Sequence, residues 1–453
     1  MSIKTQLEPT PLTTKDVRLA TWICFFAWTF AVYDFVLFGN LLPQLASELG
    51  WSEGRSTEVN TWVTAGTALV AFAIGPITDR IGRRKGILVA VAGAAIASVL
   101  TALAGWIAGI AAGVGIVFLV IVRSVAGLGY AEQAINAAYL NEIFAYAYSD
   151  PAKARRRGLI YSLVQSGWPI GSVLAAASVY LLFPIGGWQL CFVIAAVPAL
   201  FIVIAGIWLR ESPQFILRKQ VDQLLREGRE DEARGVAEAN GMAAVDPSPP
   251  LIAVFSGESR RSILTVGTSF LLNWVGVLTF SILGTSLLTS PDGKDIAFDS
   301  ALLILVVSNA TAFAGYLFHG WLGDKIGRRN AIGLGWIACS LAFFGMMMTP
   351  DGSFGPIIVL YSLGLFFLIG PFSALLYFTG ESFPAHTRAT GSALVNASGQ
   401  VGAIIGGLLI TATLTSGGDW GQAALLWGCL PILASGLLIF AAKNVDPASV
   451  RFD

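Results

Sequence analysis

Residues 75–85 read GPITDRIGRRK, and residues 320–330 read GWLGDKIGRRN. Each stretch is a short charged turn between two long apolar segments, and the two copies begin 320 − 75 = 245 residues apart in a chain of 453. The shared glycines allow two helices to approach closely, and the arginines hold the turn in cytoplasmic water. The repeat predicts a duplicated bundle of membrane helices, an arrangement that points to transport.

The composition agrees with a membrane environment. Hydrophobic residues make up 55% of the chain and charged residues 12%, with a mean hydropathy of +0.71, whereas a soluble domain carries about 25% charged residues. The 28 basic residues balance the 28 acidic ones, so no nucleic-acid partner is expected. The four cysteines lie in apolar runs without CxxC spacing, so we expect no disulfide framework, no metal site and no cofactor.

Twelve apolar segments are long enough to cross a bilayer, which takes roughly 20 residues. They lie at about 18–43, 57–78, 86–105, 114–141, 158–183, 187–209, 263–289, 299–322, 330–348, 355–379, 389–413 and 420–442. The predicted fold class is therefore an all-α membrane protein with twelve transmembrane helices in two pseudo-symmetric six-helix bundles. The predicted divisions are an N-terminal tail (1–17), a first bundle (18–209), a linker (210–262), a second bundle (263–442) and a C-terminal tail (443–453).

The basic residues predict the topology. With both termini in the cytoplasm, Arg55 and Lys294 lie outside, Arg123 lies within a span, and 28 − 3 = 25 basic residues are cytoplasmic. This distribution satisfies the positive-inside rule. We therefore expect a multi-pass protein of the plasma membrane, or of the inner membrane in a bacterium, with both termini and both tails cytoplasmic.

The linker is expected to form a helix along the cytoplasmic face. Ser212-Pro213 is a helix start, the residues that follow are amphipathic, and the Pro-rich segment DPSPP at 246–250 ends the pattern.

The duplicated turn resembles the loops between helices 2 and 3 and between helices 8 and 9 of the major facilitator superfamily. That resemblance implies two bundles that rock about a central substrate site. It also implies that an acid at the end of helix 4 or helix 10 pairs with the turn and locks the cytoplasmic side, so replacing Asp79 is expected to shift the resting population inward. The residues of this cytoplasmic gate are Gly75, Asp79, Arg80, Gly82, Arg83, Glu142, Gly320, Asp324, Gly327, Arg328, Glu381 and Arg388.

Three ionisable residues lie within predicted spans: Asp34, Arg123 and Glu132. Such a group costs at least about 2.5 kcal/mol in the membrane and is expected to face the interior or an aqueous cavity. Asp34 lies about 24 Å from the cytoplasmic entry of its helix and Arg123 about 13 Å from the outer entry of its own, at a rise of 1.5 Å per residue. We expect the two at similar depth, able to meet across the cavity.

The sequence around Asp34, TFAVYDFVLFGNLLPQL, resembles the Asp-Gly-Phe-Asp segment of aromatic-acid and sialate proton symporters, although the first aspartate of that segment is absent. Arg123, Gly127 and Gly129 resemble a proton-coupling motif of the superfamily. We expect Asp34 or Glu132 to carry the coupling proton, and Arg123 either to tune that acid or to bind an anionic substrate. The alternative is a static ion pair that holds two helices together.

Other polar and aromatic residues in the spans are candidates for the cavity wall, although amides also join membrane helices. With Arg123, the substrate-binding candidates are Tyr33, Asn136, Gln165, Trp168, Asn273, Trp274, Asn309, Tyr316, Tyr377, Asn396 and Gln400.

These features predict proton-coupled uptake of a small organic acid, with the carboxylate, protons and the lipid bilayer as partners of a monomer. A sugar:proton symporter is the first alternative, because Tyr33-Asp34 and Glu211-Ser212-Pro213 also resemble sugar porters. Drug or metabolite efflux is the second. A channel would need a continuous pore, and no nucleophile, metal constellation or GxxxxGK(S/T) loop indicates an enzyme or an ATP-driven pump.

Overall fold

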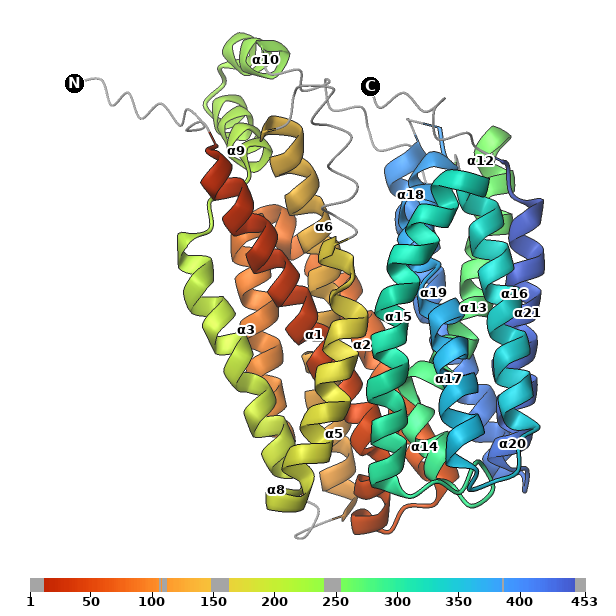
Figure 1. Cartoon of the computed structure of the whole chain (residues 1–453). Coiled ribbons are helices and arrows are strands. Elements are labelled where there is room, and N and C mark those ends of the chain that lie inside the picture. Colours follow the sequence, from red (N-terminus) through yellow and green to blue (C-terminus); the bar gives the residue numbers. More distant parts are fainter. Residues whose placement is uncertain are drawn as a thin grey trace.

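The computed structural model describes residues 12–105, 107, 112–147, 163–239, 254–384 and 387–444, and within these ranges the secondary structure is entirely helical. Two bundles stand side by side (Figure 1). The first contains α1 (Thr14–Leu49), α2 (Glu53–Ile81), α3 (Arg83–Thr101), α5 (Ala112–Ala126), α6 (Leu128–Ala147) and α8 (Gly167–Ala205).

The second bundle begins after α12 (Gly257–Ser262) with two short π-helical segments on either side of α13. Its elements are η2 (Ile263–Gly267), α13 (Thr268–Val277), η3 (Leu278–Ile282), α14 (Gly284–Thr289), α15 (Phe298–Ile326), α16 (Arg328–Met347), α17 (Phe354–Ile369), α18 (Phe372–Glu381), α19 (Arg388–Thr415), α20 (Trp420–Ala423), η5 (Ala424–Cys429) and α21 (Leu430–Leu438).

The described residues contain eleven helical segments that are long and apolar enough to span a membrane. One of them, Leu163–Trp208, has 46 residues, more than twice the roughly 20 that one crossing needs. Its backbone leaves the helical region at Gly186 and Gly187, where φ of Gly187 is +64°, and Figure 1 shows α8 folding back there. Counting it as two crossings gives the twelve spans that the sequence predicts.

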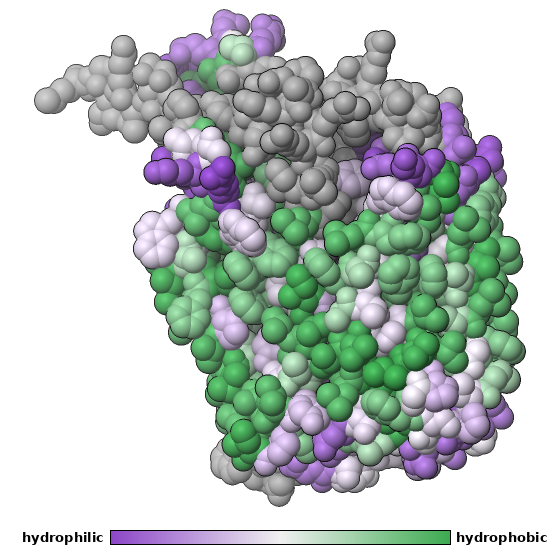
Figure 2. Space-filling model, in the orientation of Figure 1, coloured by the Kyte–Doolittle hydropathy of each residue, from purple (hydrophilic) through white to green (hydrophobic). Residues whose placement is uncertain are grey.

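The outer surface is suited to lipid. Leu69, Phe72 and Leu181 are each more than 60% exposed on the sides of the bundles, where water would make them costly. Figure 2 shows a broad hydrophobic band on this face, with hydrophilic residues gathered toward the two ends of the molecule.

The described chain begins at Leu12 and ends at Asn444 at the same end of the molecule, here called the terminal end; the opposite end is the far end (Figure 1). Both copies of the charged turn lie at the terminal end. Gly82 joins α2 to α3 at φ +102°, and Gly327 joins α15 to α16 at φ +88°. Residues with a Cβ rarely adopt such angles, which explains the glycine in both copies.

The linker also lies at the terminal end. The Ser212 hydroxyl accepts a hydrogen bond from the Phe215 amide and caps α9 (Pro213–Arg226), which is followed by α10 (Glu230–Ala239). The predicted helix start is confirmed. The Pro-rich segment at 246–250 lies outside the described residues.

The two bundles meet tightly at the far end. The Thr285 hydroxyl of α14 donates to Asn40 Oδ1 of α1 over 3.2 Å, and the rings of Phe183 and Phe298 pack edge to face at 5.5 Å. Gly39 faces the backbone carbonyl of Ile282 so closely that a Cβ there would overlap the carbonyl oxygen. The far end is therefore closed in this conformation.

Candidate functional site

A cavity of about 200 Å³ lies between the two bundles. One wall comes from α1, α6 and α8, and the other from α13, α15, α17, α18 and α19. Its lining is Trp28, Tyr130, Gln133, Ala134, Ala137, Gln165, Trp168, Phe270, Trp274, Val277, Tyr316, Ile369, Phe372, Leu375, Thr379, Ser392, Val395 and Asn396. Thr379 and Ser392 belong to the terminal-end turns of α18 and α19, so the cavity extends toward that end.

Aromatic rings from both bundles form part of the cavity wall. The rings of Trp28 and Trp168 lie 6.1 Å apart in the first bundle. Trp274 of the second bundle packs edge to face against Trp168 at 6.1 Å and against Tyr130 at 6.2 Å. Flat rings at this spacing favour a flat, apolar ligand body.

Several hydrogen-bond donors on this wall have no partner among the described residues. They are the indole Nε1 atoms of Trp28, Trp168 and Trp274 and the amide Nε2 of Gln165, whose Oε1 accepts from Gln133. A buried donor without an acceptor costs about 1–3 kcal/mol. No Asp, Glu, Lys, Arg or His occurs among the described lining residues. The cavity is therefore suited to a ligand that combines a ring with hydrogen-bond acceptors.

Asp34 and Arg123 meet, but inside the first bundle and not across the cavity as expected. Arg123 Nη1 lies 3.2 Å from both carboxylate oxygens of Asp34, and its Nη2 donates to the Asp34 backbone carbonyl. The Ser98 hydroxyl donates to the same carboxylate over 2.5 Å. The Arg123 guanidinium also lies over the rings of Phe38 and Phe192. Neither residue is among those that line the cavity, and the partners of the pair all lie in the first bundle.

Glu132 and Asn136 lie on α6 behind the cavity wall. Both are completely buried, and Asn136 Nδ2 donates to the backbone carbonyl of Cys24 on α1 over 2.8 Å. Neither oxygen of Glu132 has a hydrogen-bond partner among the described residues.

Some of the other substrate-binding candidates line the cavity, and the rest do not. Gln165, Trp168, Trp274, Tyr316 and Asn396 line the cavity. The remaining candidates lie outside the lining: Tyr33, Asn273 and Asn309 are buried among helices, Tyr377 packs against Arg328, and Gln400 lies beside Tyr130.

Three prominent lining residues, Trp28, Tyr130 and Gln133, were not among the sequence candidates. A signal existed on α6, since Tyr130, Gln133 and Ala137 follow the spacing i, i+3, i+7 that places residues on one helix face. No comparable spacing distinguishes Trp28 on α1, which is apolar around its circumference.

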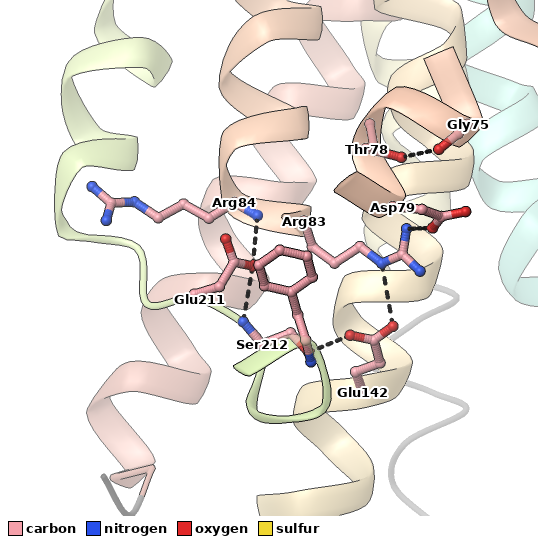
Figure 3. Close-up of polar contacts among 9 residues, drawn as sticks. Gly75, Thr78, Asp79, Arg83, Arg84, Glu142, Glu211 and Ser212 are labelled. Atoms are coloured by element: carbon pink, nitrogen blue, oxygen red, sulfur yellow. Dashed lines mark hydrogen bonds and ion pairs between the residues drawn. The ribbon is translucent and has the colours of Figure 1, made fainter. Parts of the chain in front are cut away.

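The first charged turn forms a network at the terminal end (Figure 3). Arg83 lies between two acids: its Nη1 is 2.6 Å from Asp79, and its Nε is 3.2 Å from Glu142. The Ser212 hydroxyl also bonds to Glu142. Glu211 accepts from the backbone amides of Arg84 and Ser212 over 3.0 Å, which ties the start of the linker to the turn.

The second turn has a smaller counterpart. Arg328 pairs with Glu381 and lies over the Tyr377 ring at 4.7 Å. The ion pairs of the first turn lie within the first bundle, and the ion pair of the second turn lies within the second bundle, so none of them joins the two bundles. These ion pairs are formed in a conformation whose cavity extends toward the terminal end. The expectation that replacing Asp79 shifts the resting population inward stays a prediction. The two turns contain the gate candidates Gly75, Arg80, Gly320 and Asp324. Arg388 is the first residue of α19 and lies near Glu381.

Comparison with known proteins identifies the family. A sequence profile of the Major Facilitator Superfamily matches residues 21–407 and, in a second alignment, 269–452. The chain belongs to this superfamily. It is accordingly a multi-pass membrane transporter and not an enzyme, and its all-helical fold is that of the superfamily.

Relatives that are named for their substrates cover 82% or more of this chain. The niacin transporter NiaP of Acinetobacter baylyi is 24% identical over 98% of both chains. The gallate transporter of Pseudomonas putida is 26% identical over 92% of this chain and 90% of its own. The probable 4-methylmuconolactone transporter of Cupriavidus pinatubonensis is 25% identical over 82% of this chain and 77% of its own.

A solved structure supports the fold. The inward open conformation of the xylose transporter XylE from E. coli matches 95% of this chain and 97% of its own with a TM-score of 0.69, at 16% sequence identity.

Proposed function

We propose that this superfamily transporter is a secondary active symporter that takes up a small ring-bearing organic acid together with a proton. The cavity between the bundles carries the proposal. Its aromatic wall fits a flat ring, and the unpartnered N–H groups of Trp28, Trp168 and Gln165 fit the oxygens of a carboxylate.

The substrates named for the relatives support this choice. Niacin and gallate are ring-bearing carboxylic acids, and 4-methylmuconolactone is a ring-bearing acid as well. Because the described residues of the cavity wall include no cation, an ionised carboxylate would enter with favourable hydrogen bonds but without a countercharge from them. Co-transport of a proton compensates that charge. We keep Asp34, Arg123 and Glu132 as the residues of the proton-coupling site.

The orientation follows from the charges. The described ends of the chain, the two Arg-rich turns and the linker lie at the terminal end. Arg55 is in the first turn of α2 and Lys294 is in the connection between α14 and α15, and both of these segments lie at the far end. By the positive-inside rule the terminal end is cytoplasmic. A closed far end and a cavity that extends toward the terminal end then correspond to the inward-facing state of an alternating-access cycle. The proposed location is the plasma membrane, or the inner membrane of a bacterium, with a monomer as the working unit.

A sugar:proton symporter is the second candidate. The fold likeness to the xylose transporter suits it, as do Gln133, Gln165 and Asn396 on the wall, because amides hydrogen-bond to sugar hydroxyls. The unpartnered indole N–H groups favour the acid, since a donor-only group needs an acceptor-rich ligand.

Counterflow in proteoliposomes tests the proposal. Vesicles containing the purified chain are loaded with unlabelled nicotinate, gallate, benzoate, benzamide or xylose and diluted into the labelled form of the same compound. We expect protein-dependent counterflow for at least one ring carboxylate and none for xylose. Counterflow of xylose alone would contradict the organic-acid proposal and favour the sugar:proton symporter. Protein-free vesicles correct for passive entry of the neutral acids.

A further inference from the structure

Two glutamine side chains form an amide pair on the cavity wall. Gln133 of α6 donates a hydrogen bond from Nε2 to Oε1 of Gln165, which lies two residues before α8, over 2.8 Å. Both residues line the cavity. The bond leaves Nε2 of Gln165 buried and without a partner among the described residues, and it leaves Oε1 of Gln133 as the acceptor of the pair.

The pair presents both hydrogen-bonding functions to a ligand. A lysine or an arginine presents donors only and therefore favours an anion. The amide pair keeps a donor and an acceptor in either orientation of the two amides, because a hydrogen bond between them uses one N–H group and one carbonyl in both cases. A primary carboxamide complements this pattern, since its carbonyl accepts from Gln165 and its N–H donates to Gln133.

The charges around the cavity do not require a charged ligand. The described lining residues include no Asp, Glu, Lys, Arg or His. The Arg123 guanidinium is paired with Asp34 inside the first bundle, and Arg328 is paired with Glu381 inside the second. An uncharged ligand therefore leaves none of these cations unpaired, and it avoids the free-energy cost of removing a carboxylate from water.

The amide pair is placed to bind a substituent of a ring that packs on the aromatic wall. Gln165 and Trp168 are three residues apart in one helical segment, a spacing that puts their side chains on the same face of the helix. The rings of Trp28 and Trp168 lie 6.1 Å apart on this wall. A flat ring that packs against Trp168 therefore brings its planar head group toward the amide pair.

We propose that the cavity recognises a ring with a planar carbonyl head group and does not require a negative charge, so that uncharged ring carboxamides are carried as well as ring acids. The inference rests on the proposed function, because it assigns a second substrate class to the same site. The N–H groups of Trp28, Trp168 and Gln165 bind the oxygens of an acid. The pair of Gln133 and Gln165 binds both the carbonyl and the N–H of a carboxamide.

Calorimetric titration of the purified full chain tests the inference without a variant. Benzamide is expected to bind with a dissociation constant within about tenfold of that of benzoate, since one hydrogen bond changes affinity by about this factor. Methyl benzoate keeps the carbonyl but has no hydrogen to donate to Gln133, so it is expected to bind about tenfold more weakly than benzamide. Binding of benzoate without binding of benzamide would show that the site requires a charge and would overturn the inference.

Gln133→Lys tests the role of the amide pair. The variant replaces the acceptor of the pair by a cation, so the ratio of benzoate affinity to benzamide affinity is expected to rise at least about tenfold. Gln223→Lys is the matched control, because Gln223 is exposed on α9 and does not line the cavity. An unchanged ratio in Gln133→Lys would contradict the assignment of the head group to this pair.

Counterflow of labelled benzamide in proteoliposomes tests whether the carboxamide is carried, and protein-free vesicles correct for its passive entry. Protein-dependent counterflow of benzamide that unlabelled benzoate inhibits is the expected result. Counterflow of ring acids without counterflow of benzamide would refute the inference and leave the proposed function intact. Counterflow of benzamide without any ring acid would refute the proposed acid transport and leave the recognition of an uncharged head group intact. Counterflow of neither class would refute both.

Discussion

Gly39→Val is expected to abolish transport and to hold the far end of the molecule open. In the closed state Gly39 of α1 lies against the backbone carbonyl of Ile282, and a Cβ would overlap the carbonyl oxygen. A backbone group of the opposite bundle cannot turn away as a flexible side chain can. The hydrogen bond from the Thr285 hydroxyl to Asn40 lies beside this contact and would be lost with it. Without far-end closure, the cycle stops in the outward-facing state.

The separation of the far ends measures this effect. Spin labels at Glu53 of α2 and Ser416 after α19 lie on exposed positions of opposite bundles, and the four native cysteines are buried. Double electron–electron resonance is expected to give a longer distance between the two spin labels in Gly39→Val than in the parent protein. Gly355→Val is the matched control, because nothing lies within 4 Å of a Cβ there. A native distance together with native transport in Gly39→Val would contradict the closure model.

Trp168→Ala is expected to weaken binding of the ring acid by about 30-fold or more, a cost of about 2 kcal/mol, as for other large aromatic anchors. Trp168 contributes a cavity wall, an edge-to-face contact with Trp274 across the bundles, and an unpartnered N–H. Trp168→Phe keeps a ring and loses the donor, so a smaller loss of about tenfold is expected from one hydrogen bond to a charged group.

Calorimetric titration of the purified variants with the ring acid that shows counterflow gives these affinities. Trp22→Ala is the control, since Trp22 is 52% exposed on the side of α1 and does not line the cavity. Equal affinities for Trp168→Ala and Trp22→Ala would show that the substrate binds elsewhere.

Most of the fold could be predicted because its signals are local. A run of apolar residues long enough to span, a glycine that permits φ near +90° at Gly82 and Gly327, and the clustering of arginines each depend on a few adjacent residues. The repetition of one turn in both halves then gives the duplication. The break of α8 at Gly186-Gly187 falls at the boundary between the fifth predicted span, which ends at 183, and the sixth, which begins at 187, because two adjacent glycines are also a local signal.

The candidate site was harder to predict because it depends on the rotation of each helix about its own axis. In a helix that is apolar all round, no stripe distinguishes the lipid face from the cavity face. Trp28 was therefore missed, and Asp34 and Arg123 were expected to meet across the cavity although both point into the first bundle. The free-energy cost of a charge in the membrane correctly predicted that Asp34, Arg123 and Glu132 lie in the interior. That cost does not predict which of these side chains form ion pairs or hydrogen bonds.

The central claim is that a ring carboxylate binds between Trp28, Trp168 and Trp274. The most direct test is a crystal structure of the protein with a bromine-substituted nicotinate or benzoate, in which anomalous scattering locates the bromine. The account predicts one anomalous peak in this cavity, with the carboxylate within hydrogen-bond distance of at least one of the unpartnered N–H groups. A peak beside Arg123 with its ion pair to Asp34 opened, or no peak in the cavity at saturating ligand, would contradict it.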